Sequence, residues 1–330
     1  MKISVIGAGA WGTTIASLLA EKGLDTVIWA LEEKTVFNIN GARENTQYLP
    51  GIRLNTHLKA VKDMAEAAYG AEIIVFAIPS KFLRSSLQSA GDSIKKKSII
   101  LSLTKGIEKD SFKTPSQIIS EITDNNTVVA LSGPNLSLEI AKGLPAASVA
   151  ASKDAAAAKK VQEVLSGEKF RIYTSDDITG VEIGGAMKNV IALAAGICDG
   201  LNLGNNAKSA LIVRGLAEIT RLGLALGAKA ETFYGLSGIG DLITTCESSL
   251  SRNHTVGREI SRGKKVKDIL QNMSAIPEGV ETALSAYELS KKLGVDMPIT
   301  AEVHAVIFGG KDPKDAISGL MARTPKSERH

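Results

Sequence analysis

Short apolar runs alternate with stretches of helical spacing through the first half of the chain. The runs are rich in β-branched residues and cover residues 3–6, 26–29, 72–78, 98–103 and 127–131. Each run suits a strand, and the stretches between them repeat apolar residues at the spacing of an amphipathic helix. Nearly continuous apolar strands separated by helices predict a parallel sheet covered on both faces, which is a doubly wound α/β domain.

The pattern changes beyond about Thr179. Strand signals fade, and Ala, Leu and Ile at helical spacing fill residues 181–198, 209–226 and 282–293. The second half is therefore predicted to be all-helical. The chain has 330 residues, which exceeds the size at which one core usually suffices, so we expect two domains, residues 1–179 and 180–330.

A glycine motif follows the first predicted strand. Gly7, Gly9 and Gly12 form G-x-G-x-x-G between that strand and a predicted helix. Gly7 permits a tight turn, Gly9 lets phosphates approach the backbone, and Gly12 lets the helix pack closely on the strand. Glycine turns are common in α/β proteins, so a purely structural turn stays open. The helix and second strand that follow favour a Rossmann-like site for a dinucleotide pyrophosphate, held at the helix N-terminus.

Small and charged residues follow three later strands, in the loops of residues 79–81, 104–106 and 132–135. Ligands of open α/β sheets bind at the carboxyl ends of strands, so we expect these loops to line one crevice.

The composition restricts the class of ligand. Hydrophobic residues make up 44% and charged residues 22% of the chain, which is ordinary for a globular protein and argues against disorder. The net charge is +4, aromatic residues make up 4%, and no dense basic block is interleaved with aromatics. Nucleic acid is therefore a poor candidate partner, and a small anionic substrate explains the mild positive charge.

Cysteine usage and the N-terminus predict a cytoplasmic protein. Cys198 and Cys246 lack the spacing of a metal site, so we expect reduced thiols and no bound metal. The first strand begins at the start of the chain, which leaves no room for a signal peptide. No uncharged apolar run approaches the roughly 18 residues of a membrane span.

Lys188 lies in a predicted helix three and four residues after Gly185 and Gly184. Glycine in a helix interior costs about 1 kcal/mol relative to alanine, so something must approach this face closely, and a nicotinamide ring or a substrate qualifies. Partial burial would lower the pKa of Lys188 and make it a usable acid or base near neutrality. A surface-reaching lysine beside a glycine pair that packs helices is the alternative.

A second segment carries polar groups in succession. Ser251, Arg252 and Asn253 offer a hydroxyl, a guanidinium and an amide, which together suit phosphate oxygens. Asp241 lies in a glycine-containing loop and could accept a hydrogen bond from a hydroxyl or orient a lysine. An ordinary polar loop with a capping aspartate is the alternative.

Eight motifs together resemble one family. They are GAGAWGT near the start, YLPG at Tyr48, SLTKGIE at Ser102, SGPN at Ser132, GGAMKN at Gly184, GDLITTC around Asp241, SRN at Ser251 and PEGVET at Pro277. In this order and spacing, from Met1 to about His304, the chain resembles the bacterial-type NAD(P)-dependent glycerol-3-phosphate dehydrogenases.

The resemblance implies reversible hydride transfer between sn-glycerol 3-phosphate and the nicotinamide, giving dihydroxyacetone phosphate and, in reverse, supplying glycerol 3-phosphate for phospholipid synthesis. It places the family's catalytic acid/base on Lys188 and its second active-site lysine on Lys105. Its substrate contacts fall on these lysines and on Gly133, Asn135, Asp241, Ser251, Arg252 and Asn253. Its cofactor contacts fall on Ala10, Trp11, Lys105, Ser137, Arg252, Ile276 and Glu278, beside the three glycines of the loop.

In this assignment the Lys188 ammonium would stabilise the developing oxyanion and supply its proton, and oxidation would need the neutral amine. The pKa of Lys188 should therefore be depressed by the charge of Lys105 and by desolvation. Arg252 and Asn253 would anchor the phosphate. Asn135 stands where the family more often has Ser or Thr, and Leu136 where it often has Phe.

The cofactor preference depends on residues after the second strand. Glu32 and Glu33 stand where the family often has an arginine or another polar residue, and two carboxylates would repel a 2′-phosphate, so NADH is expected over NADPH. The glutamates could instead belong to the exposed first turn of the next helix, and Lys34 or Arg43 could then turn toward the phosphate.

Two other functions stay open from the sequence. One is a dehydrogenase of a hydroxy acid of the hydroxyisobutyrate or 6-phosphogluconate type, although SRN after the GDL loop favours a phosphorylated triose. The other is a nucleotide-sensing protein without turnover, which should lack a convergent lysine pair. The sequence does not determine the oligomeric state, and a homodimer is compatible with it.

Overall fold

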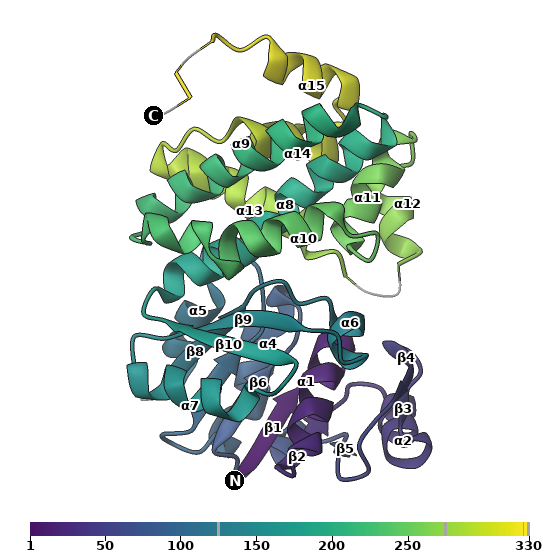
Figure 1. The fold of residues 1–330 in the computed structure, drawn as a ribbon, viewed down its shortest axis with the longest axis vertical. Helices are drawn as coiled ribbons and strands as arrows, with labels where there is room; N and C mark the ends of the chain where they lie inside the picture. The colour runs from purple at the N-terminus through teal and green to yellow at the C-terminus, as the bar shows by residue number, and fades with distance from the viewer. Residues whose placement is uncertain (124–125, 274–275, 326, 329–330) are drawn as a thin grey trace.

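The structure, a computed structural model, describes residues 1–330 except 124–125, 274–275, 326 and 329–330. A half built around a sheet and a helical half lie one above the other, with the two termini at opposite ends (Figure 1). The last strand ends at Ser175, and helix α8 begins at Ile178, where the Asp177 side chain accepts a hydrogen bond from Gly180 N. All later described elements are helical, as predicted.

The main sheet has eight strands in the order β10-β9-β8-β7-β6-β1-β2-β5. In chain order the strands are β1 Lys2–Ile6, β2 Asp25–Trp29, β5 Lys59–Val61, β6 Ile73–Phe76, β7 Ile99–Ser102, β8 Thr127–Ser132, β9 Ala146–Ala151 and β10 Phe170–Ser175. All neighbours are parallel except β8 and β9. A separate antiparallel hairpin joins β3 Glu44–Asn45 to β4 Leu49–Arg53.

The five predicted runs form the parallel neighbours β2, β1, β6, β7 and β8, as expected, whereas β9, a strand that the sequence pattern did not predict, runs antiparallel to β8. Between β8 and β9 the chain forms only a short helix, α6 Ser137–Ala141, and returns along the edge of β8 in the opposite direction. A parallel neighbour would need a longer crossover, usually a full helix. The sequence of β9 is AASVAA, whose small residues carry little strand signal. The sequence of β10 is FRIYTS, whose buried residues alternate with exposed ones, so β10 does not form a continuous apolar run.

Helices cover both faces of the sheet, which confirms the doubly wound class. Side chains alternate along the central strands: Val5 packs in one cluster with α1 Ala10–Glu21 and α7 Ala155–Leu165. Ile6 packs in the other cluster with α4 Ser80–Ala90 and α5 Pro115–Ile122. Two short helices, α2 Glu33–Phe37 and α3 Met64–Ala68, complete this half.

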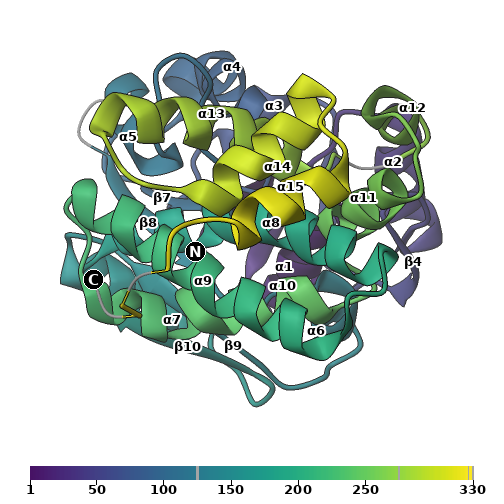
Figure 2. The same cartoon turned by 90° about the horizontal axis from the view of Figure 1, so that it is seen from above.

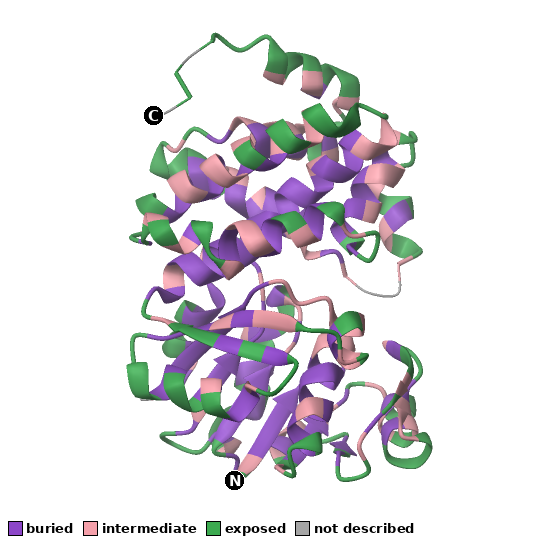
Figure 3. Ribbon diagram, in the orientation of Figure 1, coloured by how far each residue is buried: buried purple, intermediate pink, exposed green. Residues whose placement is uncertain are grey.

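The helical half is built around α8 Ile178–Gly200, whose residues 180–193 are all buried (Figures 1, 2 and 3). Around it lie α9 Gly204–Ala225, α10 Asp241–Glu247, α11 Arg252–Ser261, α12 Val266–Gln271, α13 Glu278–Leu293, α14 Pro298–Gly309 and α15 Pro313–Met321. Helix α8 has the length and hydropathy of a membrane span, but 94% of its apolar window is buried inside the molecule, as in a core helix.

Candidate active site

The glycine loop between β1 and α1 has three distinct environments. Gly7 has a φ of +115°, and a Cβ there would lie 2.6 Å from the Ala77 carbonyl oxygen. A Cβ on Gly12 would lie 1.9 Å from the Gly7 carbonyl oxygen, whereas one on Gly9 would meet nothing within 4 Å. The outer glycines are therefore required by the turn and the packing, and Gly9 leaves the backbone open to a ligand.

The start of α1 fits a dinucleotide. No side chain caps this helix, so its first N–H groups remain available to an anion. Ala10 and Trp11 form the first turn, and the buried Nε1 of Trp11 has no hydrogen-bond partner among the described residues. An open glycine face and an unpaired indole N–H are features that a bound pyrophosphate cofactor would use.

Asp241 connects the two predicted lysines. It is the first residue of α10 and is 1% exposed, and its Oδ2 lies 2.6 Å from Nζ of Lys105, in the loop after β7. Its Oδ1 pairs with Nζ of Lys188, at the middle of α8. Lys105 also donates to the carbonyl of Gly133, after β8, over 3.3 Å. One carboxylate thus brings groups of both halves together at the carboxyl ends of the strands.

The environment lowers the pKa of Lys188 to about 8, as the sequence predicts. Burial is the main cause, because desolvation disfavours the charged ammonium. The negative charge of Asp241 opposes the shift, and the positive charge of Lys105 adds to it. A lysine with this pKa can donate or accept a proton near neutral pH.

Protein atoms, and not a ligand, lie close to the glycine pair before Lys188. A Cβ on Gly184 would lie 2.5 Å from the backbone oxygen of Ser237, and one on Gly185 would lie 2.6 Å from Oγ of Ser132. The face predicted to meet a nicotinamide or a substrate is therefore occupied by the protein itself. Gly185 lets α8 approach the end of β8, and Gly184 lets it approach the backbone at Ser237, just before α10.

The SRN segment starts helix α11. Ser251 is its N-cap, with Oγ accepting a hydrogen bond from His254 N over 3.3 Å. The amide of Asn253 donates to Oδ1 of Asn189 over 2.9 Å and accepts from Gly279 N over 3.0 Å. Both side chains are buried, so the structure gives them packing roles that the sequence did not predict. Asn189 follows Lys188 directly, which ties α11 to the lysine's helix.

Arg252 is exposed on the first turn of α11, and its guanidinium forms no ion pair with a carboxylate in the described part of the chain. Glu278, the first residue of α13, is half-buried, and burial raises its pKa to about 7. The positive charges of Arg252, Lys105 and Lys188 oppose this rise, so the four groups share one electrostatic environment. Ile276 lies just before α13 and is half-buried.

The loop after β8 also lies at this site. Gly133 has a φ of +151°, and a Cβ there would lie 2.9 Å from Cα of Ser148. Asn135 accepts a hydrogen bond from Ser148 Oγ, and its buried Nδ2 has no partner among the described residues. Ser137 begins α6, and its carbonyl accepts from Thr14 Oγ1 on α1 over 3.2 Å. The loop therefore spans from the lysines to the glycine loop.

Two further features bear on the site. Among the residues that the structure describes, no cluster of three or more His, Cys, Asp or Glu side chains could hold a metal, and Cys198 and Cys246 are free and buried.

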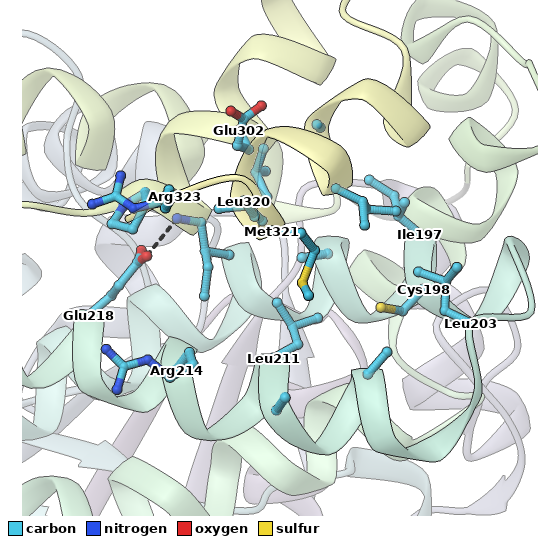
Figure 4. A pocket seen from close by; sticks show the side chains of 18 of the residues that line it. Ile197, Cys198, Leu203, Leu211, Arg214, Glu218, Glu302, Leu320, Met321 and Arg323 are labelled. Atoms are coloured by element: carbon cyan, nitrogen blue, oxygen red, sulfur yellow. Dashed lines mark hydrogen bonds between the residues drawn. The ribbon is translucent and has the colours of Figure 1, made fainter. Parts of the chain in front are cut away.

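A separate cavity of about 530 Å³ lies between α9, α14 and α15 (Figure 4). Its lining is mostly apolar and includes none of Lys105, Lys188 and Asp241. Its buried Glu218 caps the start of α14.

A glycine-loop α/β half, joined to a helical half that places a lysine at the strand ends, defines the class of two-domain nicotinamide-dependent dehydrogenases. Family models described as the N-terminus and the C-terminus of NAD-dependent glycerol-3-phosphate dehydrogenase match residues 2–158 and 177–318. The chain belongs to the NAD-dependent glycerol-3-phosphate dehydrogenase family.

Individual relatives agree. Glycerol-3-phosphate dehydrogenase [NAD(P)+] of Syntrophotalea carbinolica is 46% identical, with 99% of each chain covered, and that of Geobacter metallireducens is 47% identical, also with 99% of each covered. The crystal structure of glycerol-3-phosphate dehydrogenase from Coxiella burnetii superposes with a TM-score of 0.94 at 35% identity, covering 98% of this chain and 99% of that one. A ketopantoate reductase from Ralstonia eutropha, at 15% identity and a TM-score of 0.62, shares the fold alone.

Proposed function

We propose that the protein catalyses reversible NAD(P)-dependent oxidation of sn-glycerol 3-phosphate to dihydroxyacetone phosphate, and so supplies glycerol 3-phosphate for phospholipid synthesis. The observation that carries this proposal is the buried Asp241 carboxylate between Lys105 and Lys188, at the end of the sheet that holds the glycine loop. The family match over nearly the whole chain supports the substrate and the cofactor.

The chain's own residues divide the work. The cofactor, when bound along the glycine loop and Trp11, supplies or accepts the hydride. Lys188 gives a proton to the carbonyl oxygen of dihydroxyacetone phosphate during reduction and takes it back from the C2 hydroxyl during oxidation. Asp241 holds both lysine ammonium groups, and Lys105 adds positive charge beside the developing oxyanion.

Phosphate binding falls mainly to Arg252 in this proposal. Ser251 and Asn253 use their acceptor oxygens inside the protein, so their remaining donors can only supplement the guanidinium. A fixed phosphate aligns the distant C2 carbon with the lysine, which converts binding energy into orientation.

A spectrophotometric assay tests the activity. Dihydroxyacetone phosphate should support NAD(P)H oxidation, and glycerol 3-phosphate should support the reverse reaction. Hydroxyisobutyrate and 6-phosphogluconate serve as controls for the hydroxy-acid alternative, and turnover with them alone would contradict the proposal.

Asp241→Asn should shift the pH dependence of catalysis. The substitution keeps the shape but removes the negative charge that raises the pKa of Lys188, so this pKa should fall below about 8. Reduction should then decline at a lower pH than in the wild type, and the melting temperature should drop because two buried ammonium groups lose their counter-ion. Rate profiles from pH 6 to 9 check this, and an unchanged profile would show that Asp241 does not act on Lys188.

The cofactor preference is expected to favour NADH over NADPH in kcat/KM. Glu32 precedes α2 at the carboxyl end of β2, and its half-buried side chain is held there, whereas Glu33 and Lys34 are exposed. A carboxylate at this place suits a ribose diol and repels a 2′-phosphate. Steady-state kinetics with both cofactors measure the preference, and a clear advantage for NADPH would refute it.

Lys62 is a cation near this place that the sequence did not reveal. It follows β5, the strand paired with β2, and its ammonium contacts the carbonyl of Leu31. Arg43 likewise donates to a backbone carbonyl, that of Leu58, over 2.9 Å. Only the strand order brings Lys62 beside the end of β2, so no local pattern could have identified it.

The domain boundary, assembly and compartment extend the proposal. A boundary at residues 179 and 180 is supported by the end of β10 and the start of α8, although Ile178 and Val181 pack with the sheet. A homodimer is part of the proposal, and sedimentation equilibrium of the full-length protein tests it. A cytoplasmic location is supported by the two free, buried cysteines.

A further inference from the structure

The β3–β4 hairpin is fastened to the glycine loop through one buried side chain. Nδ2 of Asn45, which is fully buried, donates to the Ala8 carbonyl and to Thr13 Oγ1, each over 2.8 Å. Oδ1 of the same residue accepts from Tyr48 N over 3.2 Å. The turn of the hairpin is therefore fixed relative to the loop that would hold the pyrophosphate, at the side of the sheet where α2 also lies (Figure 1).

The same turn carries Tyr48 toward the end of β2. Its hydroxyl donates to Oε1 of Glu32 over 2.9 Å. Burial and the neighbouring carboxylate raise the pKa of Tyr48 to about 12, so this donor stays protonated at neutral pH. This hydrogen bond restricts rotation of the Glu32 carboxylate. Oε1 is occupied by the tyrosine, and Oε2 remains available to accept a hydrogen bond from a ligand.

The charge of Glu32 is not compensated by an ion pair within the described residues. Of the nearby cations, Lys62 and Arg43 are engaged with the backbone carbonyls of Leu31 and Leu58. Lys34, on α2, is exposed and forms no ion pair with the other described residues. Lys62 keeps its positive charge while bonded to a neutral carbonyl, so the repulsion that a phosphate at the end of β2 would meet depends on Glu32 being held toward it. The hydrogen bond from Tyr48 holds the carboxylate in that place.

We propose that Tyr48 is a specificity-determining residue that acts through Glu32: it holds this carboxylate where it accepts hydrogen bonds from the adenosine ribose diol of NAD(H) and repels the 2′-phosphate of NADP(H). This role rests on the proposed NAD(P)-dependent activity and deepens it. Tyr48 makes no contact with the cofactor in this scheme, so it is a positioning residue.

Calorimetric binding of ADP-ribose and 2′-phospho-ADP-ribose to the full-length protein tests this role without turnover. The wild type should bind ADP-ribose more tightly. Tyr48→Phe removes only the hydroxyl. It should reduce the ratio of the Kd for 2′-phospho-ADP-ribose to the Kd for ADP-ribose by about 5- to 10-fold. Tyr69→Phe, at a 74% exposed tyrosine of the same half, should leave the ratio unchanged.

Glu32→Gln completes the test without altering the hairpin. It should reduce the ratio at least as far as Tyr48→Phe, and the double variant should match Glu32→Gln alone because the tyrosine acts only through the carboxylate. An unchanged ratio in Tyr48→Phe, or additive losses in the double variant, would overturn the role of Tyr48 and leave the proposed activity intact. Failure of the wild type to bind either nucleotide would instead refute the proposed activity.

Discussion

Lys188→Ala is expected to lower kcat in both directions by at least about 100-fold, with little change in cofactor affinity. Loss of a positioned acid/base usually costs this much or more. The structure supports a large effect because Lys188 is 8% exposed, has a pKa of about 8, and shares the Asp241 carboxylate with Lys105. Steady-state kinetics of dihydroxyacetone phosphate reduction and fluorescence titration with NADH measure the two quantities.

Lys311→Ala is the matched control. Lys311 also belongs to the helical half and pairs with a single carboxylate, that of Glu302, at 2.6 Å, but far from the sheet. Its removal should leave kcat within about twofold of the wild type, as expected of a surface ion pair. A near-normal kcat in Lys188→Ala would remove this lysine from the mechanism.

Arg252→Ala should chiefly impair recognition of the phosphate. Arg252 is exposed on the first turn of α11, beside the N–H groups of that helix, and it forms no ion pair with the described residues. Loss of a charge-assisted hydrogen bond should reduce kcat/KM for dihydroxyacetone phosphate by roughly 30- to 150-fold, or about 2–3 kcal/mol. Activity on unphosphorylated dihydroxyacetone, already poor, should change little.

Arg262→Ala controls for a general effect on α11. Arg262 lies at the other end of the helix and pairs with Glu259 at 2.8 Å. This variant should keep wild-type kinetics on both substrates. Equal losses on phosphorylated and unphosphorylated substrate in Arg252→Ala would contradict phosphate recognition and assign the arginine to structure or to the cofactor.

Features that depend on local sequence could be predicted. The strand, the turn at Gly7 and the open backbone at Gly9 follow from a motif of adjacent residues, and the structure gives each glycine the expected environment. The meeting of Lys105 and Lys188 was implied by the family resemblance, and the depressed pKa of Lys188 followed from burial beside a like charge.

Features that depend on distant contacts could not be predicted. The acceptors of Ser251 and Asn253 look available in the sequence, but one caps α11 and the other bonds to Gly279 N of α13. The glycine pair before Lys188 suggests a ligand, yet its neighbours are Ser237 and Ser132, separated from it by about 50 residues in either direction along the chain. Such contacts are set by how the two halves pack, which no local pattern encodes.

The pH dependence of kcat/KM in the two directions tests the central claim, that Lys188 is the acid/base of hydride transfer. Its pKa of about 8 lies well above the second ionisation of a phosphate monoester, near 6, so the two can be separated. Reduction needs the ammonium and should fall as pH rises through about 8, whereas oxidation needs the amine and should rise through the same pH. Opposite limbs with a shared midpoint are the expected result, and parallel limbs or no ionisation between pH 7 and 9.5 would contradict the claim.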